Sequence, residues 1–79
     1  MTENSGNSTI TSGNTSIVVN HDCSFTPNAG QITITRTNEP TNPVDYVLIS
    51  GISNTQFTVY VDTDPGASGF TFGWSVNNN

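Results

Sequence analysis

Positive charge is almost absent from this chain: its 79 residues include one Lys or Arg, against six Asp and Glu, which gives a net charge of −5. A protein that follows a nucleic-acid backbone must neutralise several phosphates, which a single arginine cannot do. An anionic membrane surface would repel the chain as well. We therefore expect neither a nucleic acid nor a membrane among its partners.

Cysteine is nearly absent too. Cys23 is the only one, which excludes an intrachain disulfide and any zinc site rich in cysteine. The first residues have neither a basic start nor an apolar run, and no stretch approaches membrane-spanning length. The sequence thus indicates a chain that is made and folded in a reducing cytoplasm, with no signal for secretion.

Small polar residues dominate what is present: 13 Thr, 11 Asn and 9 Ser make up 33 of the 79 residues. Threonine suits a half-exposed strand, and asparagine and serine suit turns. Short alternating runs are separated by Gly, Pro, Asn and Ser, and no window has helical apolar spacing. We predict an all-β fold, a small antiparallel β-sandwich or partly open barrel, with strands over 9–11, 15–20, 31–37, 44–50, 56–62 and 70–76.

The last two predicted strands carry three of the four Phe and the only Trp, at alternating positions: Phe57, Val59 and Val61, then Phe70, Phe72, Trp74 and Val76. Between them, Asp64-Pro65-Gly66 fits a type II turn, because proline fixes φ near −65° and glycine tolerates positive φ. We therefore predict a β-hairpin, with both strands side by side and one shared apolar face.

The domain organisation follows from composition and length. Residues 1–8 contain no apolar side chain after Met1 and are predicted to be a flexible arm, residues 9–76 a single β-sandwich domain, and residues 77–79 a polar tail. A chain of this length can bury only a marginal core, so we expect a partner subunit to supply further stability.

One stretch could carry chemistry, because His21, Asp22 and Cys23 are consecutive. Neighbours in an extended chain point to opposite faces, and there is no second His or Cys to complete a ligand set. We predict that the His21 ring hydrogen-bonds a backbone group. In the loop that follows, Phe25 is either an anchor or an exposed contact residue.

For the charged residues near turns, the sequence leaves two alternative roles in each case. Asp62 and Asp64 could present carboxylates to Ca²⁺, but few other oxygen ligands are near in sequence, which favours a role in the turn. Arg36, at the end of a strand, could pair with Glu39 or Asp45 or lie solvated at the rim. Two prolines make 37–43 a protruding loop.

The two tyrosines are candidates for a contact surface. Alternation places Tyr60 outward, opposite to Phe57, Val59 and Val61, whereas Tyr46 fits either the core or the surface. If both lie outside, they form a flat aromatic platform for a sugar ring or a protein partner. Val18 points away from the inward Ile17 and Val19, so that strand is covered on both faces or lies at a subunit contact.

The run from Gly13 to Val76 resembles a small β-sandwich module of tailed-bacteriophage structural proteins, found in capsid surface proteins and as a distal domain of tail fibres. The likeness lies in the order of His21, then Phe25-Thr26-Pro27, then Pro65-Gly66-Ala67-Ser68-Gly69, then Phe72-Gly73-Trp74, together with the strands 15–20, 32–35 and 57–61 and the loop 38–42. Similar modules commonly have a Gly-Leu-Gly-like run after the His, where this chain has Asp22-Cys23-Ser24. The loop before Phe25 is therefore expected to differ in shape.

The resemblance implies a non-enzymatic virion protein without cofactor or metal. Because the sequence begins at Met1 and shows no shaft or stalk, we expect a capsid decoration or cement protein that binds the major capsid protein. It would act as a homo-oligomer, with a trimer favoured, on the capsid surface. The expected contact residues are Phe25, Glu39, Tyr46 and Tyr60. The alternative is a tail-tip or fibre-associated module that binds a receptor glycan through Tyr46, Tyr60 and the loop 37–43.

Overall fold

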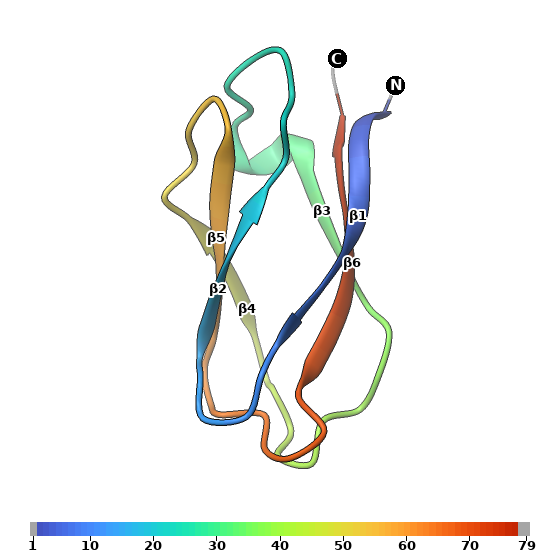
Figure 1. Cartoon of the computed structure of the whole chain (residues 1–79), viewed down its shortest axis with the longest axis vertical. Helices are drawn as coiled ribbons and strands as arrows, with labels where there is room; N and C mark the ends of the chain where they lie inside the picture. Colours follow the sequence, from blue (N-terminus) through green and yellow to red (C-terminus); the bar gives the residue numbers. More distant parts are fainter. Residues whose placement is uncertain (1, 78–79) are drawn as a thin grey trace.

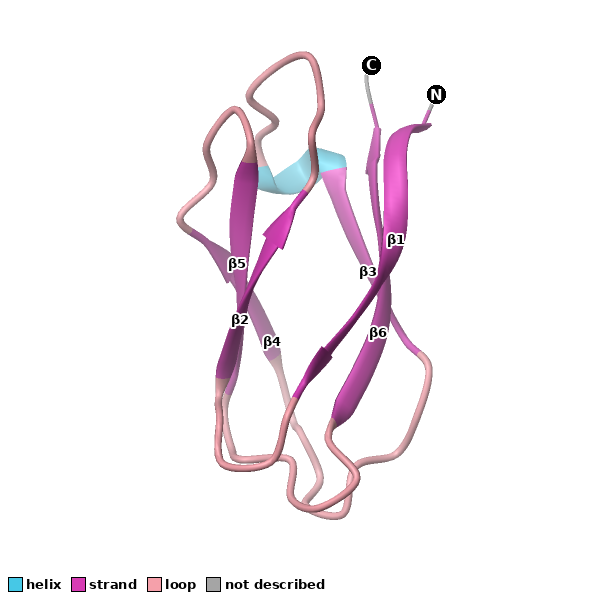
Figure 2. Cartoon of the chain, in the orientation of Figure 1, coloured by secondary structure: helices cyan, strands magenta, loops and turns pink. Residues whose placement is uncertain are grey.

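The computed structural model describes residues 2–77, which form two three-stranded antiparallel sheets packed face to face (Figures 1 and 2). Sheet A has the order β1-β6-β3 and sheet B the order β2-β5-β4. The strands are β1 (Thr2–Ile10), β2 (Ser16–Asn20), β3 (Ile32–Arg36), β4 (Val47–Ser50), β5 (Gln56–Val61) and β6 (Phe70–Asn77), and a 3₁₀ turn, η1 (Ala29–Gln31), precedes β3. The all-β prediction is confirmed in its sandwich form, since the sheets do not close into a barrel.

The core fills the space between the sheets and comes mainly from the two central strands. β5 and β6 alternate buried side chains with partly buried or exposed ones as the sequence predicted, with Phe57, Val59, Phe70, Phe72 and Val76 fully buried. Phe57 of sheet B meets Trp74 of sheet A edge to face, with ring centroids 5.8 Å apart. This aromatic contact joins the two layers.

The predicted hairpin is wrong, because β5 and β6 lie in different sheets and face each other across the core. Alternation requires only that each strand presents one face to an apolar layer, and an opposing sheet satisfies this as well as a neighbouring strand does. The connection 62–69 therefore crosses from sheet B to sheet A. Gly66 has φ +87, the positive value that the predicted turn requires at its position.

The predicted flexible arm is also wrong for the described residues. β1 begins at Thr2 and pairs with β6 from Thr2 opposite Asn77 to Ile10 opposite Phe70, with one register shift between Thr2 and Asn4. Backbone hydrogen bonds hold this strand, and composition does not reveal them. The folded domain therefore includes residues 2–8, which were predicted to precede it. Asn77 ends β6, and residues 78 and 79 of the predicted tail lie outside the described residues.

The two ends of the sandwich differ in what they carry (Figure 1). At one end lie the loops 21–28 and 51–55, together with both chain termini. At the other end the turn 11–15 and the loops 37–46 and 62–69 come together. Here the Asn42 amide donates to the carbonyl of Asp64, and Thr41 N–H donates to the Ser68 hydroxyl.

Within residues 2–77 no helix is long and apolar enough to cross a membrane.

Candidate binding surface

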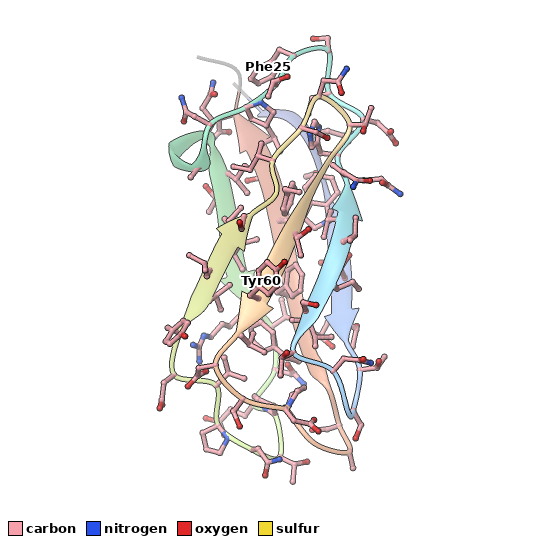
Figure 3. The ribbon with its side chains drawn as sticks, turned by 90° about the vertical axis from the view of Figure 1, so that its left-hand side faces the viewer. Phe25 and Tyr60 are labelled. Atoms are coloured by element: carbon pink, nitrogen blue, oxygen red, sulfur yellow. The ribbon has the colours of Figure 1, made fainter. Side chains whose placement is uncertain are left out.

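Four large apolar side chains are exposed to solvent on the outer face of sheet B or next to it. The exposed fractions are 59% for Tyr46, 55% for Leu48, 52% for Val18 and 41% for Tyr60. Leu48 lies directly opposite Tyr60 in the β4–β5 pair, and Val18 lies opposite Thr58 in the β2–β5 pair. We call these four residues the sheet B face. Figure 3 shows Tyr60 projecting from the central strand of this face.

Among the described side chains on the outer face of sheet A, none is large and apolar. Its outward residues are Ser5, Asn7, Thr9, Thr33, Thr35, Thr71, Gly73 and Ser75. They are small and uncharged, and the hydroxyls of Thr9 and Thr71 lie 3.2 Å apart. The two faces of the sandwich thus differ in chemistry, and only the sheet B face exposes a cluster of apolar surface.

The structure decides the position of Tyr46, which the sequence left open between core and surface. Its backbone N–H lies 3.4 Å from Oδ1 of Asp62, which also accepts a hydrogen bond of 3.0 Å from the N–H of Asp45. These bonds hold the start of β4 beside the end of β5. Tyr46 is exposed just before the first residue of β4, so it lies on the surface and not in the core, beside the strand that carries Leu48.

The other two candidate residues lie elsewhere. Phe25 is half-buried and packs against the core in the loop at the end that carries the termini, well above Tyr60 in Figure 3. It therefore has the anchor role that the sequence offered as one of two. Glu39 is exposed in the loop joining β3 to β4, at the opposite end. The structure brings together Tyr46 and Tyr60 but not Phe25 and Glu39.

A groove opens along the side of the sandwich where β3 and β4 form neighbouring sheet edges. Its lining residues are Ile34, Arg36, Asp45, Tyr46, Val47 and Ile49. Arg36 forms no ion pair with described residues. Its guanidinium carbon instead lies 5.7 Å from the centre of the Phe70 ring, a cation–π contact at an exposed site. The opposite side of the sandwich is more closed, because β1 packs beside β2 and the Asn4 amide donates to the carbonyl of His21.

His21 is fully buried and both of its ring nitrogens have backbone partners. Nδ1 accepts a 3.0 Å hydrogen bond from the N–H of Cys23, so we assign the proton to Nε2, which lies 2.9 Å from the carbonyl oxygen of Ser53. The ring also stacks on Phe57, with centroids 6.0 Å apart. The predicted backbone hydrogen bond is confirmed, and the ring joins β2, the loop 51–55 and the core.

The two turn carboxylates serve as hydrogen-bond acceptors within the fold. Oδ1 of Asp64 accepts the N–H of Gly66 at 2.9 Å and the N–H of Gly13 at 3.0 Å, which ties the turn 11–15 to the loop 62–69. These two bonds favour the charged form and hold the pKa of Asp64 below its usual range. Among residues 2–77, no three His, Cys, Asp or Glu side chains are grouped so that they could hold a metal ion.

Comparison with known proteins adds no assignment: no protein-family model, no curated protein and no solved structure matches the chain. Its function is therefore inferred from the geometry described above. Sequence reasoning identified Tyr46, Tyr60 and Val18 as surface candidates but missed the groove between β3 and β4. A signal for it exists in Val47-Leu48-Ile49, where apolar residues occupy both faces of a strand.

Proposed function

We propose that this protein is a non-enzymatic structural protein of a bacteriophage virion, a capsid decoration protein that binds the major capsid protein through the sheet B face. The observation that carries a binding role is the exposure of Val18, Leu48 and Tyr60 on one face of a small sandwich, with Tyr46 exposed beside them. The largest exposed apolar patch of a small protein is often a contact site. The virion context comes from the resemblance of the His21, Phe25-Thr26-Pro27 and Phe72-Gly73-Trp74 pattern to phage modules.

The size of the face limits how such binding would work. Each of the four side chains is about half exposed. At about 200 Å² for a large side chain, they expose on the order of 400 Å² together. At about 25 cal/mol per Å², covering it contributes roughly 10 kcal/mol. Association itself costs about 4–15 kcal/mol. A single copy would therefore hold its partner weakly, and copies linked in an oligomer would be retained better, because several faces would then bind neighbouring sites of the shell together.

Stabilisation of the head would follow from linkage. A ligand that binds the assembled shell better than its free subunits shifts the assembly equilibrium toward the shell. The negative net charge would keep the copies soluble before they attach. No step of this role requires a bond to be made or broken.

The test is to locate the protein on particles of the phage whose genome encodes it. We expect antibody labelling on heads, and heads of a deletion strain that release DNA at lower temperature. A variant with Leu48→Ser and Tyr60→Ser should fail to restore the missing protein to such heads. A variant with Thr33→Ser, on the outer face of sheet A, should restore it. Absence of the protein from purified particles would overturn the proposal.

A second candidate function is a glycan-binding module at a tail tip, favoured by the shared exposure of Tyr46 and Tyr60. Exposed tyrosine rings can stack on the apolar face of a sugar, and the loop 37–43 lies beyond the Tyr46 end of β4. A glycan array with the full chain tests this candidate. Specific binding that is lost in Tyr60→Ala, together with labelling on tails, would replace the decoration role.

A further inference from the structure

We propose that two copies of this chain associate edge to edge through β4, in antiparallel register centred on Leu48, to form a twofold dimer with a continuous six-stranded sheet. This goes beyond the proposed function, because it concerns copies of the chain in solution and holds whatever the sheet B face binds. The twofold arrangement also differs from the trimer that the resemblance implied.

The first argument is the character of β4. It is the terminal strand of sheet B, so the N–H and C=O groups of every second residue point away from β5 and have no strand partner within residues 2–77. Natural edge strands are usually protected by short length, lysine, proline, a bulge or an inward charge. β4 is only four residues long, but Val47-Leu48-Ile49-Ser50 has none of the other devices, and its pairing with β5 is regular.

The second argument is that β4 is apolar on both faces while both faces are partly open. Leu48 is 55% exposed on the outer face, and Val47 and Ile49 are half-buried along the groove on the inner face. A strand with apolar residues on both faces is normally covered on both. The present single chain leaves this coverage incomplete on the outer face, at the free edge and along the groove.

The third argument is that β4 is complementary to itself. A twofold axis through Leu48, perpendicular to the sheet, pairs residue i with residue 96 − i of the other copy, because only an even sum keeps inner residues opposite inner residues. Leu48 then meets the second Leu48 on the outer face, and Val47 meets Ile49 on the inner face. Tyr46 lies opposite Ser50. Each pair places apolar or uncharged groups together, and Asp45 lies at the far end from the Asp45 of the other copy.

The other edges are less suitable for the same contact. In β3, a twofold axis through Ile34 would put the charge of Arg36 opposite the buried Ile32. In β1, the inward positions paired with Trp74 and Phe72 are Gly6 and Ser8, which offer little apolar surface. β2 has a comparable sequence around Val18, but Val19 is only 3% exposed and β1 already packs beside that edge.

The exposed area along the β4 edge predicts a weak dimer. The open parts of Tyr46 and Leu48 and of the groove residues fall well short of the roughly 800 Å² per partner of a standard interface. Backbone ladder bonds would fix the geometry and the register, and association should depend on concentration in the way transient dimers do. Joining two copies at β4 would also place their outer sheet B surfaces side by side, so that Val18 and Tyr60 of both copies would lie on one continuous surface.

The test traps the contact with disulfides in the full chain. In Leu48→Cys the two new thiols would lie in a directly opposed pair, whose Cα atoms are about 4.5–5.5 Å apart, within the range that a disulfide accepts. The matched control is Val18→Cys, which places a thiol on the same outer face at the centre of the other edge of sheet B. The wild type, with buried Cys23, gives the background level.

We expect mild oxidation to link most of the Leu48→Cys chain at high concentration, with at least a tenfold lower yield from Val18→Cys. A mixture of Tyr46→Cys and Ser50→Cys chains should give the mixed dimer in preference to either homodimer, which checks the register. Equal linking of Leu48→Cys and Val18→Cys, or linking of Val18→Cys alone, would overturn edge pairing through β4. So would failure of both to link.

Sedimentation of the unmodified chain provides a second measurement. We expect the apparent mass to rise toward that of a dimer with concentration, and Leu48→Lys to remain a monomer over the same range because a charge at the twofold axis faces its own copy. Circular dichroism would establish that the variant keeps its strands. A wild-type chain that stays monomeric at the highest concentration would overturn the proposal.

Discussion

The indole ring of Trp74 lies against the backbone of Gly6, its register partner in the neighbouring strand. A Cβ atom at Gly6 would be 3.1 Å from Cζ2 and 3.2 Å from Nε1 of the ring. Trp74 is 9% exposed, so β1 forms the wall that keeps the ring within the core. A strand with almost no apolar residues thus contributes to the core through the absence of a side chain.

From this contact we expect Gly6→Ala to lower the free energy of unfolding by about 1–3 kcal/mol, because the added methyl group overpacks against a buried ring. Urea unfolding followed by the fluorescence of Trp74 measures the change. Gly30→Ala is the control, since its nearest neighbour, Oδ1 of Asn28, would be 3.4 Å away. Equal stability of the two variants would contradict the close approach.

Deletion of residues 2–10 should abolish cooperative unfolding, because it strips one edge of β6 of its hydrogen-bond partner and removes the fully buried Ile10. Thermal melts by circular dichroism would show this as the loss of a sigmoidal transition. A double variant with Ser5→Thr and Asn7→Thr, on the outer face, should melt close to the wild type. A truncated chain that melts like the full chain would show that β1 is dispensable.

Asp22 adopts φ +50, the left-handed region that non-glycine residues rarely occupy. We expect Asp22→Val to cost about 1–2 kcal/mol of stability, since a β-branched side chain tolerates this conformation poorly, while Asp22→Asn stays close to the wild type. Chemical denaturation measures both, and Thr26→Val in the same loop is the control. A tolerated valine at position 22 would contradict the strained backbone.

The free energy of unfolding should fall in acid, partly because the Asp64 carboxylate becomes protonated. Its pKa is lowered in the folded state by hydrogen bonds from Gly66 and Gly13, so the unfolded chain binds a proton more readily. The stabilisation is therefore complete above the unfolded pKa of about 4 and is lost as the pH falls through the lower folded value.

Replacing this carboxylate by an amide, Asp64→Asn, keeps an oxygen acceptor but removes the titration. We expect the difference in melting temperature between wild type and variant to be largest near pH 6 and to shrink between about pH 4 and pH 2. Asp45→Asn is the comparison, because the Asp45 carboxylate accepts no hydrogen bond from described residues. A difference that does not change with pH would remove Asp64 from the acid response.

Alternation along single strands could be read from the sequence, because it is a local property of an extended backbone. Val19 lies inside and Val18 outside, and Tyr60 is exposed between the buried Val59 and Val61, as predicted. Period-two spacing fixes the face of each side chain without reference to any partner strand. The backbone hydrogen bond of the His21 ring was also predicted, whereas its complete burial was not.

Partner choice between strands could not be predicted in this way. The alternating phenylalanines suit adjacent strands and opposed sheets equally, so they did not reveal that β5 and β6 face each other across the core. The glycines, serines and asparagines of β1 gave no apolar pattern, because that strand is held by the β6 backbone and by the space that Gly6 leaves for Trp74.

Residue order was enough to predict that the chain is all-β, with one cation and one cysteine, and which side chains each strand turns inward. Only the folded arrangement reveals that residues 2–10 complete sheet A, that Tyr46 is exposed, and that β4 is left as an uncovered apolar edge. Local propensity acts over neighbouring residues. Sheet order, by contrast, depends on hydrogen bonds and packing between segments far apart in the chain.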